Sequence, residues 1–183
     1  MNTRPALLRT SSLAPLLGCA ALALAQAAPE VPDSIKPPQG ETLLLRAHAS
    51  GSQIYVCSQP ADGKAQWTLK APDAELRDEQ GKAIIHHSAG PSWQHTDGSA
   101  VTGRAVARAD SPEADAIPWL LVTAVSHQGH GVLAQVTSIQ RLHTHGGQPP
   151  LAAHCDAARL NAEIRVPYTA DYYFYAPAPR PAH

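Results

Sequence analysis

Histidine is the residue type in this sequence with the greatest potential for chemistry, since it occupies ten of the 183 positions. His143 and His145 stand two residues apart in RLHTHGG, so a strand that continues through both would present the two imidazoles on one face. Paired imidazoles are typical ligands of zinc and copper. His143, His145 and the nearby His154 are therefore the candidate metal ligands, with His87 and His95 as alternative third ligands.

Several features limit the metal hypothesis. The histidines are spread over at least five segments, and the sequence contains no H-E-x-x-H motif. No carboxylate stands at a ligand-like spacing from the histidine pair, and the only methionine is Met1. A histidine-dependent zinc or copper protein, or a metalloenzyme, is therefore the second hypothesis. Under the leading hypothesis, a non-catalytic binding module, we expect no cofactor.

The segment IIHHSAGPSWQHTDGSAVTG, residues 84–103, admits two interpretations. Adjacent residues on a strand point to opposite faces, so His86 and His87 cannot both line one pocket. His87, Trp93 and His95 could form the wall of a ligand pocket. The favoured alternative is a corner of a β-fold, in which Gly and Pro turn the chain and Trp93 fills the end of the core.

The stretch YTADYYFY contains most of the tyrosines. Alternation places Tyr173 and Tyr175 on one face with Asp171, and Tyr168, Tyr172 and Phe174 on the other. An exposed row of rings, with Tyr173 and Tyr175 as its candidate residues, would stack on sugars. A strand buried on both sides is favoured, because the chain has nine aromatic residues in all and a core needs them.

Catalytic signatures are missing from the sequence. No G-x-S-x-G elbow occurs, and the acidic residues stand mostly in turns and polar edges. We assign no catalytic residue, and an enzymatic role is the less favoured one.

The elements that would position these residues are short β-rich runs bounded by Gly, Pro, Asp or Ser. DEQG and TDGS are typical of hairpin turns. IPWLLVTAV and GVLAQVTSI are predicted to be central strands that form a hairpin, while PPLAAHCDAARLN could contain one short helix. TLLLRAHA and SQIYVCS are predicted as separate strands, as are AQWTLKA and the run AELRDEQGKAIIHH, which contains the DEQG turn. The sequence therefore predicts an all-β, antiparallel sandwich or barrel.

The two ends of the chain differ from this middle part. Residues 1–27 have the basic start, apolar stretch and A-x-A site of a secretory signal peptide, with a lipoprotein anchored at Cys19 as the alternative. Residues 28–40 and 176–183 are rich in proline and are expected to be an extended leader and tail around one domain, residues 41–175.

Export would leave a weakly acidic protein in the periplasm or outside the cell. Cleavage after residue 27 removes two arginines and leaves twelve basic against fifteen acidic residues, a net charge near −3. This charge disfavours nucleic acid as a partner. No later apolar run is long enough to span a bilayer. Cys57 and Cys155, the two cysteines left, are expected to form a disulfide in an oxidising compartment.

Several motifs occur together in one order: QIYVC, WTLKAPDAEL, HHSAGPSWQHTDGSAVTG, IPWLLVTA, VTSIQRLHTHGG, the downstream Cys155 and VPYTADYYFY. In the identity and order of these motifs, the chain resembles a secreted bacterial and fungal family known as domain of unknown function 3455. The resemblance covers residues 43–175 and implies no activity or catalytic residues. The leading hypothesis is a non-catalytic module that binds a small molecule, a glycan or a component of the cell envelope, or that associates with a surface.

Overall fold

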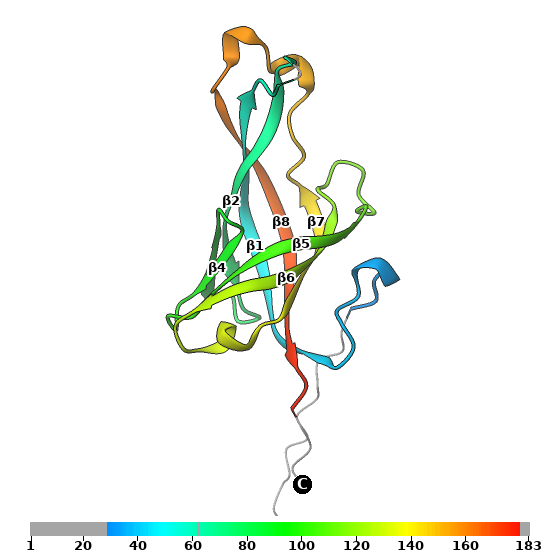
Figure 1. Ribbon diagram of the computed structural model, residues 1–183, viewed down its shortest axis with the longest axis vertical. Helices are drawn as coiled ribbons and strands as arrows, with labels where there is room; N and C mark the ends of the chain where they lie inside the picture. Colours follow the sequence, from blue (N-terminus) through cyan, green and yellow to red (C-terminus); the bar gives the residue numbers. More distant parts are fainter. Residues whose placement is uncertain (1–28, 62, 180–183) are drawn as a thin grey trace, which may run out of the picture.

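Eight antiparallel strands form a closed barrel in the computed structural model, which describes residues 29–61 and 63–179 (Figure 1). Each strand pairs with the next, and β8 pairs with β1 to close the sheet. The all-β prediction is confirmed, and the closure decides between barrel and sandwich. The strands are β1 (Glu41–Ser58), β2 (Gln66–Arg77), β3 (Ala83–Ser88), β4 (Ser92–His95), β5 (Ala100–Ala109), β6 (Trp119–Gln128), β7 (Ser138–Gly146) and β8 (Glu163–Pro177).

The helical segments are all single turns of 3-10 helix. In the described part of the chain no helix reaches seven residues, and none is long and apolar enough to cross a membrane. The predicted signal peptide, residues 1–27, and Cys19 lie outside the described residues. The four turns are η1 (Asp33–Ile35), η2 (Val132–Gln135), η3 (Ala152–His154) and η4 (Ala157–Arg159).

Strands β1 and β2 are longer than the sequence predicted. The expected break at Gly51 is wrong, because β1 continues through it. A Cβ at this position would lie 2.3 Å from the carbonyl oxygen of Asp73, so the glycine permits close approach of β1 and β2 rather than a turn. β2 likewise continues through Pro72. As a result β1, β2 and β8 project beyond the other strands (Figure 1).

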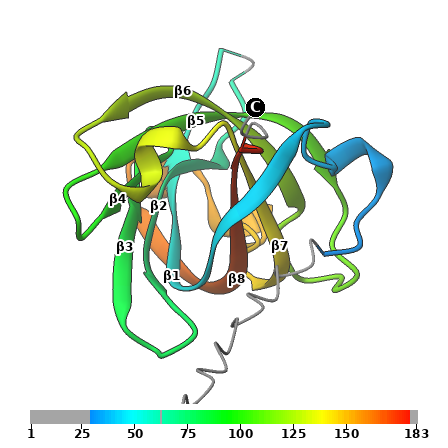
Figure 2. The same ribbon diagram turned by 90° about the horizontal axis from the view of Figure 1, so that it is seen from below.

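The predicted hairpin of β6 and β7 is formed, since the two strands pair antiparallel. Its connection is less regular than expected, because η2 replaces the first half of the predicted strand GVLAQVTSI. Leu133 and Val136 are fully buried and belong to the core inside the barrel. η2 lies at the end of the barrel that faces the viewer in Figure 2, so its apolar side chains fill that end. The last four residues of β6 are exposed, so this strand is not buried on both faces as predicted.

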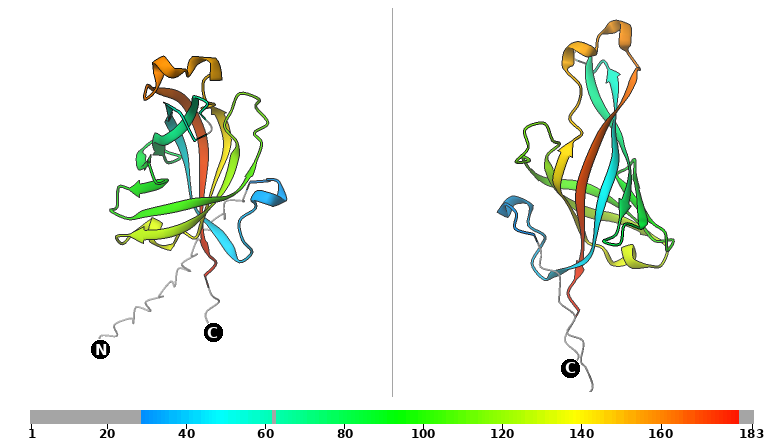
Figure 3. Two further views of the ribbon diagram at one scale, coloured as in Figure 1. Left: turned by 45° about the horizontal axis from the view of Figure 1, so that its top comes forward. Right: turned by 180° about the vertical axis from the view of Figure 1, so that it is seen from behind.

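The predicted disulfide is present and joins Cys57 at the end of β1 to Cys155, with the two Cα atoms 5.4 Å apart. Cys155 lies in the connection from β7 to β8, where η3 and η4 take the place of the single helix that the sequence suggested. The backbone reinforces the link, since the N–H of Asn161 donates to the carbonyl of Cys57 at 2.8 Å. Figure 3 shows this connection at the tip of the long strands.

A second apolar cluster lies outside the barrel wall. Residues 29–40, predicted to be an extended leader, instead place the fully buried Ile35 of η1 in this cluster. The Nε2 of Gln140 donates to the carbonyl of Ile35 at 2.6 Å. At the other end, Ala176 and Pro177 of the predicted tail belong to β8. Segments on both sides of residues 41–175 therefore contact the barrel.

Candidate site: a cavity in the barrel lumen

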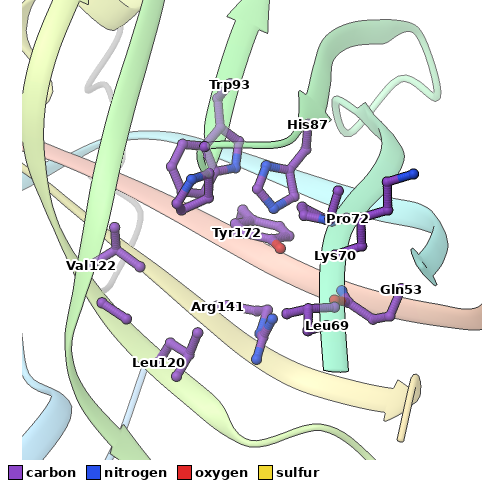
Figure 4. Close-up of a pocket in the computed structure, with 14 residues that line it drawn as sticks. Gln53, Leu69, Lys70, Pro72, His87, Trp93, Leu120, Val122, Arg141 and Tyr172 are labelled. Atoms are coloured by element: carbon purple, nitrogen blue, oxygen red, sulfur yellow. The ribbon is translucent and has the colours of Figure 1, made fainter. Parts of the chain in front are cut away.

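The barrel encloses a cavity of about 300 Å³ at the level where the apolar filling of the η2 end stops. Every strand contributes at least one side chain, so the cavity is the lumen of the barrel and not a surface groove. Leu69 and Lys70 are exposed and stand at its rim, whereas Trp93 and Tyr172 are buried at its base (Figure 4). The lining residues are Gln53, Leu69, Lys70, Ala71, Pro72, His87, Gly90, Pro91, Trp93, Ala105, Leu120, Val122, Arg141 and Tyr172.

One wall of the cavity is aromatic. His87 and Trp93 are cross-strand partners on β3 and β4, and their rings stack with centroids 4.4 Å apart and an interplanar angle of 6°. Tyr172 meets both rings edge-on, at 5.3 Å from His87 and 6.0 Å from Trp93. Gly103 makes room for the indole, because a Cβ there would lie 3.2 Å from Cζ3 of Trp93 and 2.4 Å from Val122.

His87 is held in its neutral form. Its Nδ1–H donates to the carbonyl of Ser92 at 2.8 Å, since a carbonyl can only accept. Burial lowers the pKa of His87 to about 4; the hydrogen bond to Ser92 opposes this, and the positive charge of Arg141 lowers the pKa further. At neutral pH the imidazole is therefore uncharged and behaves as part of the aromatic wall.

The opposite side of the cavity carries nitrogen donors without acceptors. Nη2 of Arg141 donates to the carbonyl of Pro118 at 2.8 Å, but its buried Nε has no partner. The buried Nε2 of Gln53 also lacks a partner, as does the Nε1 of Trp93 on the aromatic wall. No acidic residue is among the described residues that line the cavity. The polar groups of the lumen are thus mainly hydrogen-bond donors, and Arg141 adds a positive charge.

The tyrosines beside this cation stay protonated. Burial raises the pKa of Tyr172, and the charge of Arg141 opposes that rise without reversing it. Burial also raises the pKa of Tyr168, whose hydroxyl lies 3.4 Å from that of Tyr172. Neither phenol supplies a negative charge to balance Arg141.

The structure separates the three residues that the sequence proposed for a pocket. His87 and Trp93 line the cavity together, while they also form the corner hairpin of β3 and β4. His95 lies outside the cavity lining, and its Nδ1 accepts from the backbone N–H of Asp97 at 3.0 Å in the turn to β5. For His87 and Trp93, the predicted corner and the predicted pocket wall are therefore the same structure. His95 belongs to the corner but not to the wall.

The candidate metal ligands do not form a joint site. A bulge between Leu142 and His145, with a φ of 48° at His143, interrupts the regular strand that the prediction assumed. Nδ1 of His143 lies 3.1 Å from Asp171, whereas Nδ1 of His145 lies 2.7 Å from Glu113. His154 is exposed on η3. Within residues 29–61 and 63–179, no three His, Cys, Asp or Glu side chains are grouped so that they could hold a metal ion.

Tyr173 and Tyr175 do not form an exposed row. Both are buried in the outer apolar cluster beneath η1, which agrees with the favoured interpretation of a strand buried on both sides. The hydroxyl of Tyr175 donates to Oε1 of Gln140 at 2.7 Å. The guanidinium of Arg46 lies 5.5 Å from the ring centroid of Tyr173 and covers it from the solvent side.

Asp171 is the centre of a charged group on this outer face. Its carboxylate accepts from Arg46 and His48 at 2.9 Å and from His143 at 3.1 Å. Burial opposes ionisation of Asp171, but the three hydrogen bonds outweigh it and lower the pKa of the carboxyl group. This cluster fixes the outer wall and lies on the opposite face of β8 from Tyr172.

Sequence reasoning missed Arg141, Gln53, Tyr172 and the rim residues of β2. One signal was available for Arg141: alternation along SIQRL places it on the same face as Ile139, which belongs to the inner core. A charged residue at an inward position of a β-strand is uncommon and indicates a polar or ligand-bearing interior.

The fold and the cavity define a class of protein: a disulfide-bonded, all-β domain whose single closed sheet surrounds a partly open lumen. The family model described as "Protein of unknown function (DUF3455)" matches residues 37–176. The chain therefore belongs to the DUF3455 family, and the resemblance seen in its motifs is confirmed. Comparisons with curated proteins and with solved structures found no significant match.

Proposed function

We propose that this domain binds one small, largely apolar molecule inside its barrel. The observation that carries the proposal is the cavity of about 300 Å³ to which all eight strands contribute. This volume is at the lower end of those that hold small molecules, and mouths of barrels are common positions for such sites. An eight-stranded barrel has an interior wide enough for packed side chains or for one small ligand.

The distribution of side chains within the lumen supports binding. Towards η2 the interior is filled by residues such as Leu76, Leu133 and Phe174, all fully buried. Beyond Trp93 and Tyr172 the filling stops, although empty apolar space costs stability. A ligand seated against the flat His87–Trp93 pair would restore those contacts. The aromatic wall and the few polar groups opposite it have the composition of a binding site.

Blocking the lumen tests this proposal. Ala105 is exposed at the cavity wall on β5, so Ala105→Trp should fill the entrance without disturbing the buried core. Val106, next to it, is 50% exposed outside the cavity lining, so Val106→Trp is the matched control. Neutral aromatic compounds, including 2-naphthylacetamide, are screened by thermal shift and titrated by calorimetry. We expect binding to wild type and Val106→Trp and at least about 10-fold weaker binding to Ala105→Trp.

A screen in which no compound binds, or in which Ala105→Trp binds as tightly as wild type, would contradict the proposal. The screen would equally count against it if Val106→Trp and Ala105→Trp lost affinity together. That pattern would indicate a general effect of the added indole on β5 and not occlusion of the lumen.

We also propose that the protein acts outside the cytosol, in the periplasm or beyond it. The Cys57–Cys155 disulfide supports this, because such bonds persist in oxidising compartments. Mass spectrometry of the protein from its native host tests the proposal: a chain beginning at residue 28 is expected, and an acylated Cys19 would identify the lipoprotein alternative. An intact chain with residues 1–27 in the cytosol would overturn it.

A further inference from the structure

We infer that the ligand of the barrel is a monocarboxylate with a flat apolar body, and that Arg141 binds its carboxylate group. The inference rests on the proposed function and names the class of molecule that the cavity accepts. Three observations carry it: the hydrogen-bonding groups that lack partners, the charge of the lining, and the shape of the aromatic wall.

The buried side-chain atoms that lack partners in the described part of the chain are all donors. Five buried side-chain nitrogens have no hydrogen-bond partner in the described part of the chain, and three of them belong to residues that line the cavity. These are Nε of Arg141, Nε2 of Gln53 and Nε1 of Trp93. A buried donor without an acceptor is costly, especially on a charged group. A ligand that occupies the lumen therefore needs acceptor atoms.

The charge of the lining selects an anion. In the part of the chain that the structure describes, no carboxylate is paired with Arg141, whose partners are the backbone carbonyl of Pro118 and the neutral hydroxyl of Tyr172. The other cation, Lys70, is paired with Glu163 at the rim. Arg141 is half-buried and its Nε is shielded from water, and a charge in such a position is normally paired, so the lumen has one positive charge to neutralise.

The geometry of Arg141 favours a carboxylate. Nη2 is already used by Pro118, whereas Nε is free. Nη2 carries two hydrogens and lies on the same side of the guanidinium as the Nε hydrogen, so a carboxylate can accept from Nε and from the Nη2 hydrogen that Pro118 does not take, a bidentate arrangement stronger than a single neutral hydrogen bond. A phosphate monoester carries close to two negative charges at neutral pH and would exceed the single free cation. One guanidinium therefore matches a monocarboxylate.

The aromatic wall determines the shape of the remaining part of the ligand. His87 and Trp93 form one flat surface, since their planes differ by 6°, and Figure 4 shows Arg141 on the far side of the lumen from this pair. A planar hydrocarbon would lie against the stack, while an acid group attached to it would reach Arg141. The cavity of about 300 Å³ limits the molecule to one that is small.

A matched pair of probes isolates the carboxylate. 2-Naphthylacetate and 2-naphthylacetamide have the same shape, but only the first is charged near neutral pH. Calorimetry with wild type should give at least about 10-fold tighter binding of the acid than of the amide. Arg141→Gln should remove this preference, whereas Arg104→Gln, which changes an exposed arginine of β5 outside the cavity lining, should retain it.

A measurement on wild type makes the test independent of how Arg141→Gln folds. The Nε–H resonance of Arg141, assigned with Arg141→Lys, should shift further at saturation with 2-naphthylacetate than at saturation with the amide, because the charge-assisted hydrogen bond to a carboxylate is stronger than one to an amide carbonyl. Equal affinity for both probes, or a preference that persists in Arg141→Gln, would overturn the carboxylate inference while leaving binding in the lumen intact. Binding of neither probe would overturn the inference and the proposed function together.

Discussion

Acid should destabilise the barrel through His87. Burial lowers the pKa of this histidine to about 4, whereas an unfolded chain has the ordinary value of about 6.5. Between these two values the unfolded state binds a proton that the folded state excludes. The free energy of unfolding therefore falls as the pH drops from about 6.5 to about 4, and this contribution is constant outside that window.

The magnitude follows from the size of the shift. Each unit corresponds to about 1.4 kcal/mol, so a difference of about 2.5 units gives a total loss of about 3 kcal/mol. About 2 kcal/mol of this should be lost between about pH 7 and about pH 5, where few carboxyl groups titrate. His87 is only 3% exposed, so solvent screening does not reduce the effect much.

Urea unfolding followed by tryptophan fluorescence at a series of pH values measures this loss. His87→Phe retains an aromatic ring beside Trp93 but cannot titrate, so its stability should decline less than that of wild type by about 2 kcal/mol over the same range. His154→Gln, which changes an exposed histidine on η3, serves as the control and should behave like wild type. Parallel pH profiles for wild type and His87→Phe would refute the reasoning, even if His87→Phe were less stable at every pH.

Three further perturbations follow from the structure. Replacing Cys57 and Cys155 together by alanine should reduce the free energy of unfolding by about 4 to 5 kcal/mol on the chain-entropy estimate for a sequence separation of 98 residues, and reducing agent should then have no further effect on urea midpoints. Gly103→Ala should cost about 1 to 3 kcal/mol, because its methyl group would collide with Val122 and press on Trp93; an unchanged melting temperature would show that the wall yields easily. Asp171→Asn should cost about 1 to 2 kcal/mol at neutral pH, since Arg46, His48 and His143 lose a shared carboxylate. Because the pKa of Asp171 is lowered, the wild-type advantage should shrink as acid protonates that carboxyl group, and an advantage independent of pH would contradict this role.

Local patterns in the sequence were sufficient for the β-class and the covalent link and for most strand positions, but not for the continuation of β1 through Gly51 or of β2 through Pro72. Alternation placed the two faces of β8 correctly, with Tyr172 and Phe174 inside and Tyr173 and Tyr175 in the outer cluster. The turn residues of DEQG and TDGS mark the ends of β2 and β4. What alternation could not supply was closure, because the pairing of β1 with β8 joins residues over a hundred positions apart.

The site was harder to predict because its residues come from every strand. His87 and Trp93 were recognised since they share one hairpin, so their proximity is a local property. Arg141 and Gln53 meet that pair only across the lumen, which no spacing in the chain encodes. His143 and His145 have different partners, Asp171 and Glu113, for the opposite reason: a bulge, invisible in the sequence, replaces the regular strand that would have put both imidazoles on one face.

The pairing of β1 with β8 also places the start of the first strand beside the end of the last strand. The N–H of Ala178 donates to the carbonyl of Gly40 at 2.8 Å. Such a barrel can be circularly permuted by a linker that joins Ala178 to residue 29, ahead of η1, with a new opening at the exposed turn after Arg77. The permuted chain would keep every strand neighbour, and hence the shape of the lumen. The permuted chain would have its new termini in the turn between β2 and β3. The natural and the permuted chain could therefore be attached to a support through different parts of the barrel.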